Sequence, residues 1–257
     1  MTVRHGRAAI ALVTGLVVGA GLAPRVGAQA PPRSGEAVVE AMRARYDGRW
    51  YRTMTFVQRT TFAGRPDQTW YETVEVPGKL RIDVAPVDSM NAFMFIGDST
   101  INFRRGQRVG GRAVGNILAV LIMDAFTAPV PETVARLRAH GFDLSRVSSG
   151  RFRDRPAWIV GATGGDTTVS QFWLDAERLH LVRVLEAAPG QPLTDIQVSG
   201  HVLMNGVWIE REVRVFRGGA EVQGEYYTEV TLDPPVDPAV WSTSRYVRPG
   251  WIPRVAP

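Results

Sequence analysis

The sequence predicts an α+β domain in which antiparallel strands dominate, accompanied by one N-terminal helix and one short helical insert. Much of the chain from position 50 onward alternates apolar and polar residues, which is typical of strands that bury one face. These runs lie so close together that they must pair antiparallel, because parallel pairing needs a long crossover. Two regions show helical spacing instead. Together these observations predict about 10–11 strands in one domain.

Residues 1–28 are predicted to be a cleaved secretory signal peptide. Arg4 and Arg7 precede the uncharged apolar stretch 8–23, and Ala28 ends an Ala-x-Ala-like cleavage motif. A retained membrane anchor is the alternative, but the stretch is shorter than the ~20 residues that a spanning helix needs and contains three glycines. We therefore expect an exported, soluble, periplasmic product.

The composition of the mature chain, residues 29–257, excludes several classes of protein. Loss of residues 1–28 removes three arginines and no acidic residue, so the formal charge falls from +5 to +2. The basic balance is therefore no evidence for nucleic-acid binding, and no nucleic-acid partner is expected. The absence of cysteine excludes a disulfide scaffold, a thiol nucleophile and cysteine-ligated zinc. The remaining length suffices for one domain with a sizeable core.

The first element is an amphipathic helix. Ser34 is placed to cap its N-terminus, Glu36 lies in the first turn, and Gly48 offers a C-terminal stop. Its apolar positions recur at helical spacing: Ala37, Val38, Ala41, Met42 and Tyr46.

Period-two alternation then predicts the strands of the first half. Pro77-Gly78 and the stretch 64–67 are turn signals, and 97–100 is predicted to join two strands as a hairpin. The predicted strands are 50–62, 69–76, 80–84, 92–96 and 101–104.

The helical insert follows, and strands resume after it. Asn116 is predicted to cap one helix over 117–126, apolar on nearly every side, and a short helix over 131–140 ends before Gly141. Asn205-Gly206 is a strong hairpin signal. The remaining predicted strands are 152 with 157–162, 167–174, 179–185, 195–204, 207–216 and 221–232.

Residues with catalytic chemistry are scarce. His140 is predicted at a helix C-terminus, while His180 and His201 lie in predicted strands without a metal-ligand spacing. Neither a nucleophile elbow nor a phosphate-binding glycine pattern is present. The sequence therefore predicts a non-enzymatic protein without metal or cofactor.

Two surfaces stand out. Aromatic and apolar residues at alternate strand positions are predicted to share one apolar face: Trp50, Met54, Phe56, Trp70, Leu80 and Ile82. This excess of apolar residues indicates either a thick core or a lined cavity. A basic cluster, formed by Arg104, Arg105, Arg108 and Arg112, is predicted at a hairpin tip, either simply solvated or as a patch for anionic headgroups or a partner's acidic face.

Several short segments occur in an order typical of a known family. They are Trp70-Tyr71-Glu72, 76–83 (VPGKLRID), 95–100 (FIGDST), 156–160 (PAWIV), 172–175 (FWLD), 181–184 (LVRV) and the closing 234–241. With the N-terminal helix running directly into a long strand, they resemble the outer-membrane lipoprotein carrier and sorting family, the LolA/LolB-like superfamily. The resemblance covers about residues 34–241.

The resemblance implies an incomplete antiparallel β-barrel wrapped around the helices, with an apolar cavity that shields acyl chains. The predicted apolar face then becomes the cavity wall. The helix 117–126 becomes a lid or plug that contributes Leu118, Leu121, Ile122 and Phe126. No arginine of this chain could be matched to the one that holds the lid in the family's carriers.

Two functions follow as expectations. The first is a periplasmic binding protein for the acyl chains of lipids or lipoproteins, in outer-membrane lipoprotein sorting or envelope lipid transport. The alternative is an envelope-sensing regulatory or assembly module of the same fold that acts through protein contacts. We expect a monomer whose partners are acyl chains and an envelope membrane protein.

Overall fold

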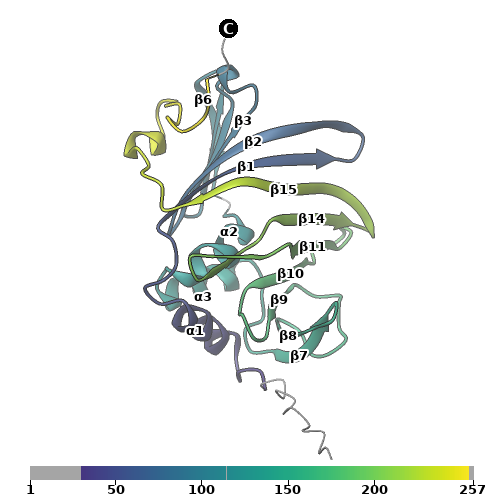
Figure 1. The fold of residues 1–257 in the computed structure, drawn as a ribbon. Coiled ribbons are helices and arrows are strands. Elements are labelled where there is room, and N and C mark those ends of the chain that lie inside the picture. The colour runs from purple at the N-terminus through teal and green to yellow at the C-terminus, as the bar shows by residue number, and fades with distance from the viewer. Residues whose placement is uncertain (1–29, 114, 255–257) are drawn as a thin grey trace, which may run out of the picture.

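One antiparallel sheet organises the chain (Figure 1). The computed structural model describes residues 30–113 and 115–254, so the predicted signal peptide lies outside the described residues. Among these, 13 strands form the sheet in the order β6-β5-β4-β3-β2-β1-β15-β14-β11-β10-β9-β8-β7, and β12 and β13 form a separate pair. The sheet curves but does not close, because β6 and β7 each have only one neighbour. The predicted α+β fold, an incomplete antiparallel barrel with enclosed helices, is confirmed.

The strands of the described chain outnumber the predicted 10–11. In the first half they are β1 (Thr53–Phe62), β2 (Arg65–Glu75), β3 (Lys79–Val84), β4 (Ala92–Ile96), β5 (Ser99–Arg104) and β6 (Gln107–Arg112). In the second half they are β7 (Val147–Phe152), β8 (Arg155–Val160), β9 (Gln171–Asp175), β10 (Leu181–Glu186), β11 (Thr194–Ser199), β12 (Val202–Met204), β13 (Val207–Ile209), β14 (Glu212–Arg217) and β15 (Ala220–Leu232).

The additional strands have local causes. Gly200, with φ +66°, interrupts the predicted strand 195–204, and Glu210-Arg211 interrupts 207–216, so each becomes two strands. The pieces next to Asn205-Gly206 pair as the β12–β13 hairpin, which confirms the predicted turn. Near the basic cluster, Arg105 and Gly106 both have positive φ and make a tight turn into β6, a strand that the sequence analysis missed.

Strand β1 begins three residues later than predicted. The backbone N–H groups of Arg49 and Trp50 donate to the Tyr46 carbonyl, so the chain is still turning after the first helix. Trp50 therefore precedes the strand. Strand β2 begins earlier than predicted, because Gly64 at φ +70° allows a turn tight enough for Phe62 to pair with Arg65.

The helices lie on the inner side of the curved sheet (Figure 1). Helix α1 (Gly35–Arg45) begins at Ser34, whose hydroxyl accepts the Ala37 N–H as predicted. The predicted helix 117–126 is in fact α2 (Ile117–Ile122) followed by the 3-10 turn η2 (Asp124–Phe126). Helix α3 (Val130–Ala139) ends at His140, as expected. None of the described helices is long and apolar enough to span a bilayer.

A C-terminal segment covers the outer side of β3–β5. It contains the 3-10 helix η3 (Pro238–Trp241), and another 3-10 turn, η1 (Val87–Ser89), links β3 to β4. Tyr246 packs against a small outer cluster that includes Met94 and Phe103. The main core lies on the inner side, between the sheet and the helices.

Candidate functional site

The strands β1, β2 and β3 build a concave wall that faces the helices. In the β1–β2 register, Met54 pairs with Val74 and Phe56 with Glu72. In the β2–β3 register, Val74 pairs with Leu80. Directly paired residues point to the same side of a sheet, so these side chains share the inner face. We call this inner face of β1–β3, continued by β15, the concave wall.

The structure brings the predicted wall residues together. Met54, Phe56, Leu80 and Ile82 are buried in one core cluster, and Trp50 and Trp70 pack against it half-buried. The two tryptophans occupy different parts of it. Trp50 stacks on Phe126 of η2, with ring centroids 3.9 Å apart, whereas Trp70 lies opposite Gln58 on the wall and donates its Nε1–H to Gln68.

Buried polar residues, which the prediction of a continuous apolar face did not include, lie among these side chains. Glu72 lies between Phe56 and Ile82, and Gln58 between Trp70 and Tyr227. Glu72 is 4% exposed, and the Oε1 atom of buried Gln58 has no hydrogen-bond partner among the described residues. The concave wall is therefore apolar with a polar centre.

Two further carboxyls belong to this polar centre. Burial raises the pKa of Glu210 to about 7, with a further contribution from Glu225. Burial also raises the pKa of Glu225 to about 7. For Glu72, burial raises the pKa well above its usual range, and the charges of Glu225 and Glu210 add to this effect. Three carboxyls that share one low-dielectric region thus favour the neutral form.

Helix α2 fills the space in front of the wall. Ile117, Ala119, Val120, Leu121 and Ile122 are all buried, and Leu118 is half-buried against the same core. A helix that is apolar on nearly every side is stable in a water-soluble domain only when other elements of the protein bury it. Of the four predicted lid residues, Leu121, Ile122 and Phe126 thus lie fully in the core and Leu118 lies at its margin.

A single buried carboxylate fixes this insert to the sheet. Asp124, 2% exposed, accepts the backbone N–H of Gly78 at the β2–β3 turn at 2.8 Å. Its other oxygen accepts Nη1 of Arg136 on α3 at 2.5 Å. Arg136 also donates from Nε to Asp98 at the β4–β5 turn at 2.9 Å. We call Asp124 and Arg136, with these turn contacts, the latch.

The latch leaves almost no space beneath it. The cavity between the β2–β3 turn, Asp124 and Arg136 has a volume of about 10 Å³, roughly one water molecule. On the far side of the insert, Arg43 of α1 donates to the carbonyls of Thr127 and Ala128. The described structure is therefore closed over this part of the concave wall.

The basic cluster lies away from the wall. Arg104, Arg105, Arg108 and Arg112 are exposed along the β5–β6 hairpin at one edge of the sheet. A role as a patch for anionic headgroups stays a prediction.

Neither the polar centre nor the latch was predicted from the sequence, for different reasons. Glu72 has the same parity as Trp70, so alternation alone could have placed it on the inner face. The Asp124–Arg136 pair had no such signal, because it forms only when α3 packs beside η2. Asp124 also lies just beyond the end of α2, inside the range 117–126 that the sequence predicts to be one helix.

Fold and site together define a class of architecture: an open antiparallel sheet curved around a buried helical insert. The chain is similar to a DUF1329 family protein from Desulfovibrio piger ATCC 29098, with a TM-score of 0.53 and 12% identity over 81% of this chain and 95% of that one. A LolA superfamily protein from Nitrosomonas europaea aligns with a TM-score of 0.49 and 11% identity, over 81% and 97%. Neither a family model nor a curated protein matches the chain. At such identities the likeness is one of fold alone.

Proposed function

We propose that the protein is a non-enzymatic periplasmic binding protein that shields the acyl chains of a lipid or lipoprotein, in outer-membrane lipoprotein sorting or envelope lipid transport. One observation carries the proposal: an apolar helix occupies the concave wall and is fixed there by one buried carboxylate. Helix α2 would then act as a plug that an acyl chain can replace, because the helix and the acyl chain would cover the same concave wall.

The energies of plug and cargo are comparable. Burying a large aliphatic side chain contributes about 1.5–3 kcal/mol, and Ile117, Val120, Leu121 and Ile122 are all buried. An acyl chain gains about 0.8 kcal/mol per buried CH₂ group, so a dozen methylenes contribute about 10 kcal/mol. Because the two sums are similar, exchange of plug for cargo is reversible, as a carrier requires.

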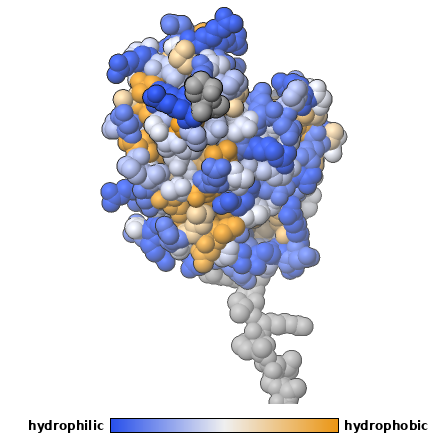
Figure 2. All heavy atoms as spheres, turned by 45° about the horizontal axis from the view of Figure 1, so that its top comes forward, coloured by the Kyte–Doolittle hydropathy of each residue, from blue (hydrophilic) through white to orange (hydrophobic). Residues whose placement is uncertain are grey.

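The distribution of apolar residues on the outer surface supports a closed arrangement of the insert. On the face shown in Figure 2, apolar residues form separate patches within a largely hydrophilic surface. The largest apolar residues of the insert are instead buried. A carrier that hides its binding surface until cargo arrives avoids exposing an aggregation-prone patch.

Native mass spectrometry of the exported protein, followed by organic extraction, tests the function directly. We expect co-purified lipid or lipoprotein acyl species in a fraction of the molecules. Protein that remains free of lipid even after incubation with envelope lipids contradicts the proposal and favours the alternative, a sensing or assembly module that acts through protein contacts.

Asp124→Asn tests the latch. The substitution keeps an acceptor for Gly78 but removes the charge that binds Arg136. Hydrogen bonds between charged groups contribute about 1.5–3 kcal/mol. The population of molecules in which α2 has left the concave wall should therefore rise about 10- to 100-fold. The measurement is binding of the apolar fluorophore N-phenyl-1-naphthylamine, with the circular dichroism of the sheet unchanged.

Asp98→Asn is the matched control. Asp98 binds the same arginine, but its side chain is 71% exposed, so its loss should alter probe binding little. A second variant, Leu121→Asp, places a charge inside the plug and should also raise probe binding. Equal probe binding by wild type and by folded D124N and L121D proteins would show that the insert is a permanent part of the core.

A further inference from the structure

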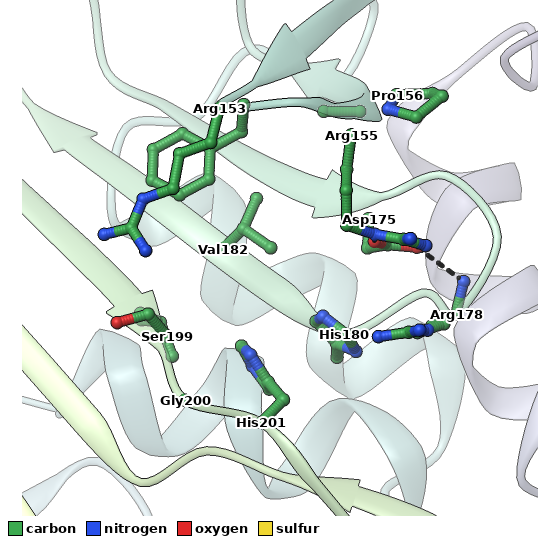
Figure 3. A pocket seen from close by; sticks show the side chains of 13 residues that line it. Arg153, Arg155, Pro156, Asp175, Arg178, His180, Val182, Ser199, Gly200 and His201 are labelled. Atoms are coloured by element: carbon green, nitrogen blue, oxygen red, sulfur yellow. Dashed lines mark hydrogen bonds and ion pairs between the residues drawn. The ribbon is translucent and has the colours of Figure 1, made fainter.

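A second site lies on the opposite face of the sheet. On strands β9 and β10, the side chains of Phe172, Leu174 and Val184 belong to the main core. Those of Asp175 and Val182 lie on the outer side of the sheet. A pocket of about 180 Å³ lies there, close to the β7–β8 turn and to the ends of β10 and β11 (Figure 3). We call it the outer pocket.

Two neutral imidazoles form one wall of the outer pocket. His180 and His201 stack with ring centroids 3.7 Å apart and an interplanar angle of 18°. Burial and, to a smaller extent, the neighbouring His201 together lower the pKa of His180 to about 3. Burial likewise lowers the pKa of His201 to about 4. The rings therefore supply a flat uncharged surface beside Val182 and Ala157, which are apolar and buried.

Three arginines border the pocket, and their guanidinium groups differ in how they are used. The guanidinium group of Arg155 is already paired within the protein, because it forms ion pairs with Asp175 and Glu177. Arg153 and Arg178 form no side-chain hydrogen bond or ion pair within the described chain. They lie on either side of Val182 in Figure 3.

Both unpaired guanidinium groups are nevertheless held in place. Arg178 stacks over the ring of Trp208 at 4.0 Å, and Arg153 stacks over Phe152 at 5.3 Å. The backbone of Arg178 is also fixed, because its N–H donates to Asp175 at 2.9 Å and its carbonyl accepts the hydroxyl of Tyr46 at 2.5 Å. Ring stacking leaves the N–H donors of a guanidinium free for a ligand.

We propose that the outer pocket binds an organic phosphate, with its anionic oxygens at Arg178 and its apolar part against Val182 and the imidazole wall, while Arg153 adds positive charge on the other side of the pocket. Guanidinium forks match phosphate oxygens in geometry and charge. Asp175 does not oppose an anion, because Arg155 neutralises it. The phosphate belongs either to a small soluble ester or to a lipid headgroup, and the site is independent of the acyl-chain function proposed for the concave wall.

The test uses the full mature chain and phenyl phosphate as the probe, measured by calorimetry and by NMR shifts of His201 and Trp208. We expect saturable binding, lost or weakened about 10- to 100-fold in Arg178→Gln, as for the loss of a charge-assisted hydrogen bond, and weakened less in Arg153→Gln. Phenol, which lacks the phosphate, should not bind measurably.

Arg65→Gln is the matched control, because Arg65 also stacks on a ring, that of Phe62, is exposed away from the pocket, and has no side-chain hydrogen bond or ion pair within the described part of the chain. Flotation with phosphatidylglycerol vesicles, compared with phosphatidylcholine vesicles, separates the two sources. Binding of phenyl phosphate would identify the ligand as a small soluble ester. Binding of anionic vesicles alone, weakened by R178Q, would identify it as a lipid headgroup. Binding of neither probe, or binding that R178Q and R153Q affect no more than R65Q, overturns the proposal.

Discussion

Arg81 is a fully buried charge on the outer side of β3. Its Nε and Nη2 atoms donate to the two oxygens of Asp83, at 2.7 and 2.9 Å, and Nη1 donates to the carbonyl of Val240. The hydroxyl of Tyr246 donates to Asp83 at 2.8 Å. A buried ion pair holds best when further hydrogen bonds satisfy both partners, and here the C-terminal segment supplies them. The pair therefore attaches that segment to the sheet.

Removal of one partner tests this attachment. Arg81→Met leaves Asp83 buried without its counter-charge, so we expect a loss of about 3–5 kcal/mol in the free energy of unfolding. Urea denaturation followed by tryptophan fluorescence measures this loss, and Trp241 and Trp251 lie in the segment concerned.

The double variant Arg81→Met with Asp83→Leu is the control, because it removes both charges. It should recover much of the lost stability, since apolar replacement of a buried pair is often tolerated. If the variant with only Arg81→Met were as stable as the wild type, the ion pair of Arg81 with Asp83 would be solvated and not buried.

The face of the sheet on which a strand residue lies could be predicted wherever apolar and polar residues alternate along the strand. Met54, Phe56, Leu80 and Ile82 were placed on one face because each occupies an alternate position of its strand. Trp50 was assigned to a strand that begins only at Thr53, because the turn after α1 depends on backbone hydrogen bonds that alternation does not report.

At the scale of elements, α2 is the one on which the proposed function depends most directly. The side chain of Asn116 caps it by accepting the N–H groups of Leu118 at 3.0 Å and Ala119 at 3.3 Å. A six-residue helix has few internal hydrogen bonds, so the cap and the latch contribute a large share of its local stability.

Asn116→Ala should loosen α2 by about 0.5–2 kcal/mol, the usual cost of losing an N-cap. We expect faster amide hydrogen exchange in α2 and stronger binding of the apolar fluorophore. The measurement is exchange at Val120 and Leu121, read by mass spectrometry.

Ser34→Ala provides the comparison, because Ser34 caps α1 in the same way. It should cost similar stability without changing probe binding. If both variants changed probe binding equally, global destabilisation rather than opening of the insert would explain the effect.

The elements themselves were largely predictable, and their boundaries were less so. Period-two runs and Asn205-Gly206 gave correct strands and a correct hairpin. The end of α2 could not be predicted, because Asp124 is held by a turn 46 residues earlier and by a helix that follows. Strand β6 was missed because its sequence, QRVGGR, is exposed throughout and lacks apolar alternation.

For the whole molecule, we expect opposite pH dependences from two groups of buried and half-buried ionisable side chains. The folded-state pKa values of Glu72, Glu210 and Glu225 are raised by burial, so their contribution is complete below about pH 4.5 and is lost as the pH rises through 7. Those of His180 and His201 are lowered, so their contribution is complete above about pH 6.5 and is lost as the pH falls toward 4 and 3.

We therefore expect the free energy of unfolding to decrease between about pH 6.5 and 8, where the carboxyls of this set titrate and the histidines do not. Glu210→Gln removes one of these carboxyls and should flatten that decrease by up to about 1.4 kcal/mol per pH unit. Denaturation at a series of pH values measures the slope. Glu229→Gln, at an exposed position of β15, is the control and should leave the slope unchanged. A slope identical in E210Q and wild type would contradict the neutral state of Glu210 in the fold.

The open ends of the sheet have a consequence for behaviour at high concentration. A sheet that does not close offers unpaired backbone groups along β6 and β7, and such edges can nucleate fibrils by adding strands from other copies. On β6, Arg108 and Arg112 flank Gly110-Gly111, and all four are exposed. Like charges brought together by edge-to-edge pairing repel, and glycine weakens strand propagation. The exposed arginines and glycines of β6 therefore disfavour edge-to-edge pairing between copies of the chain.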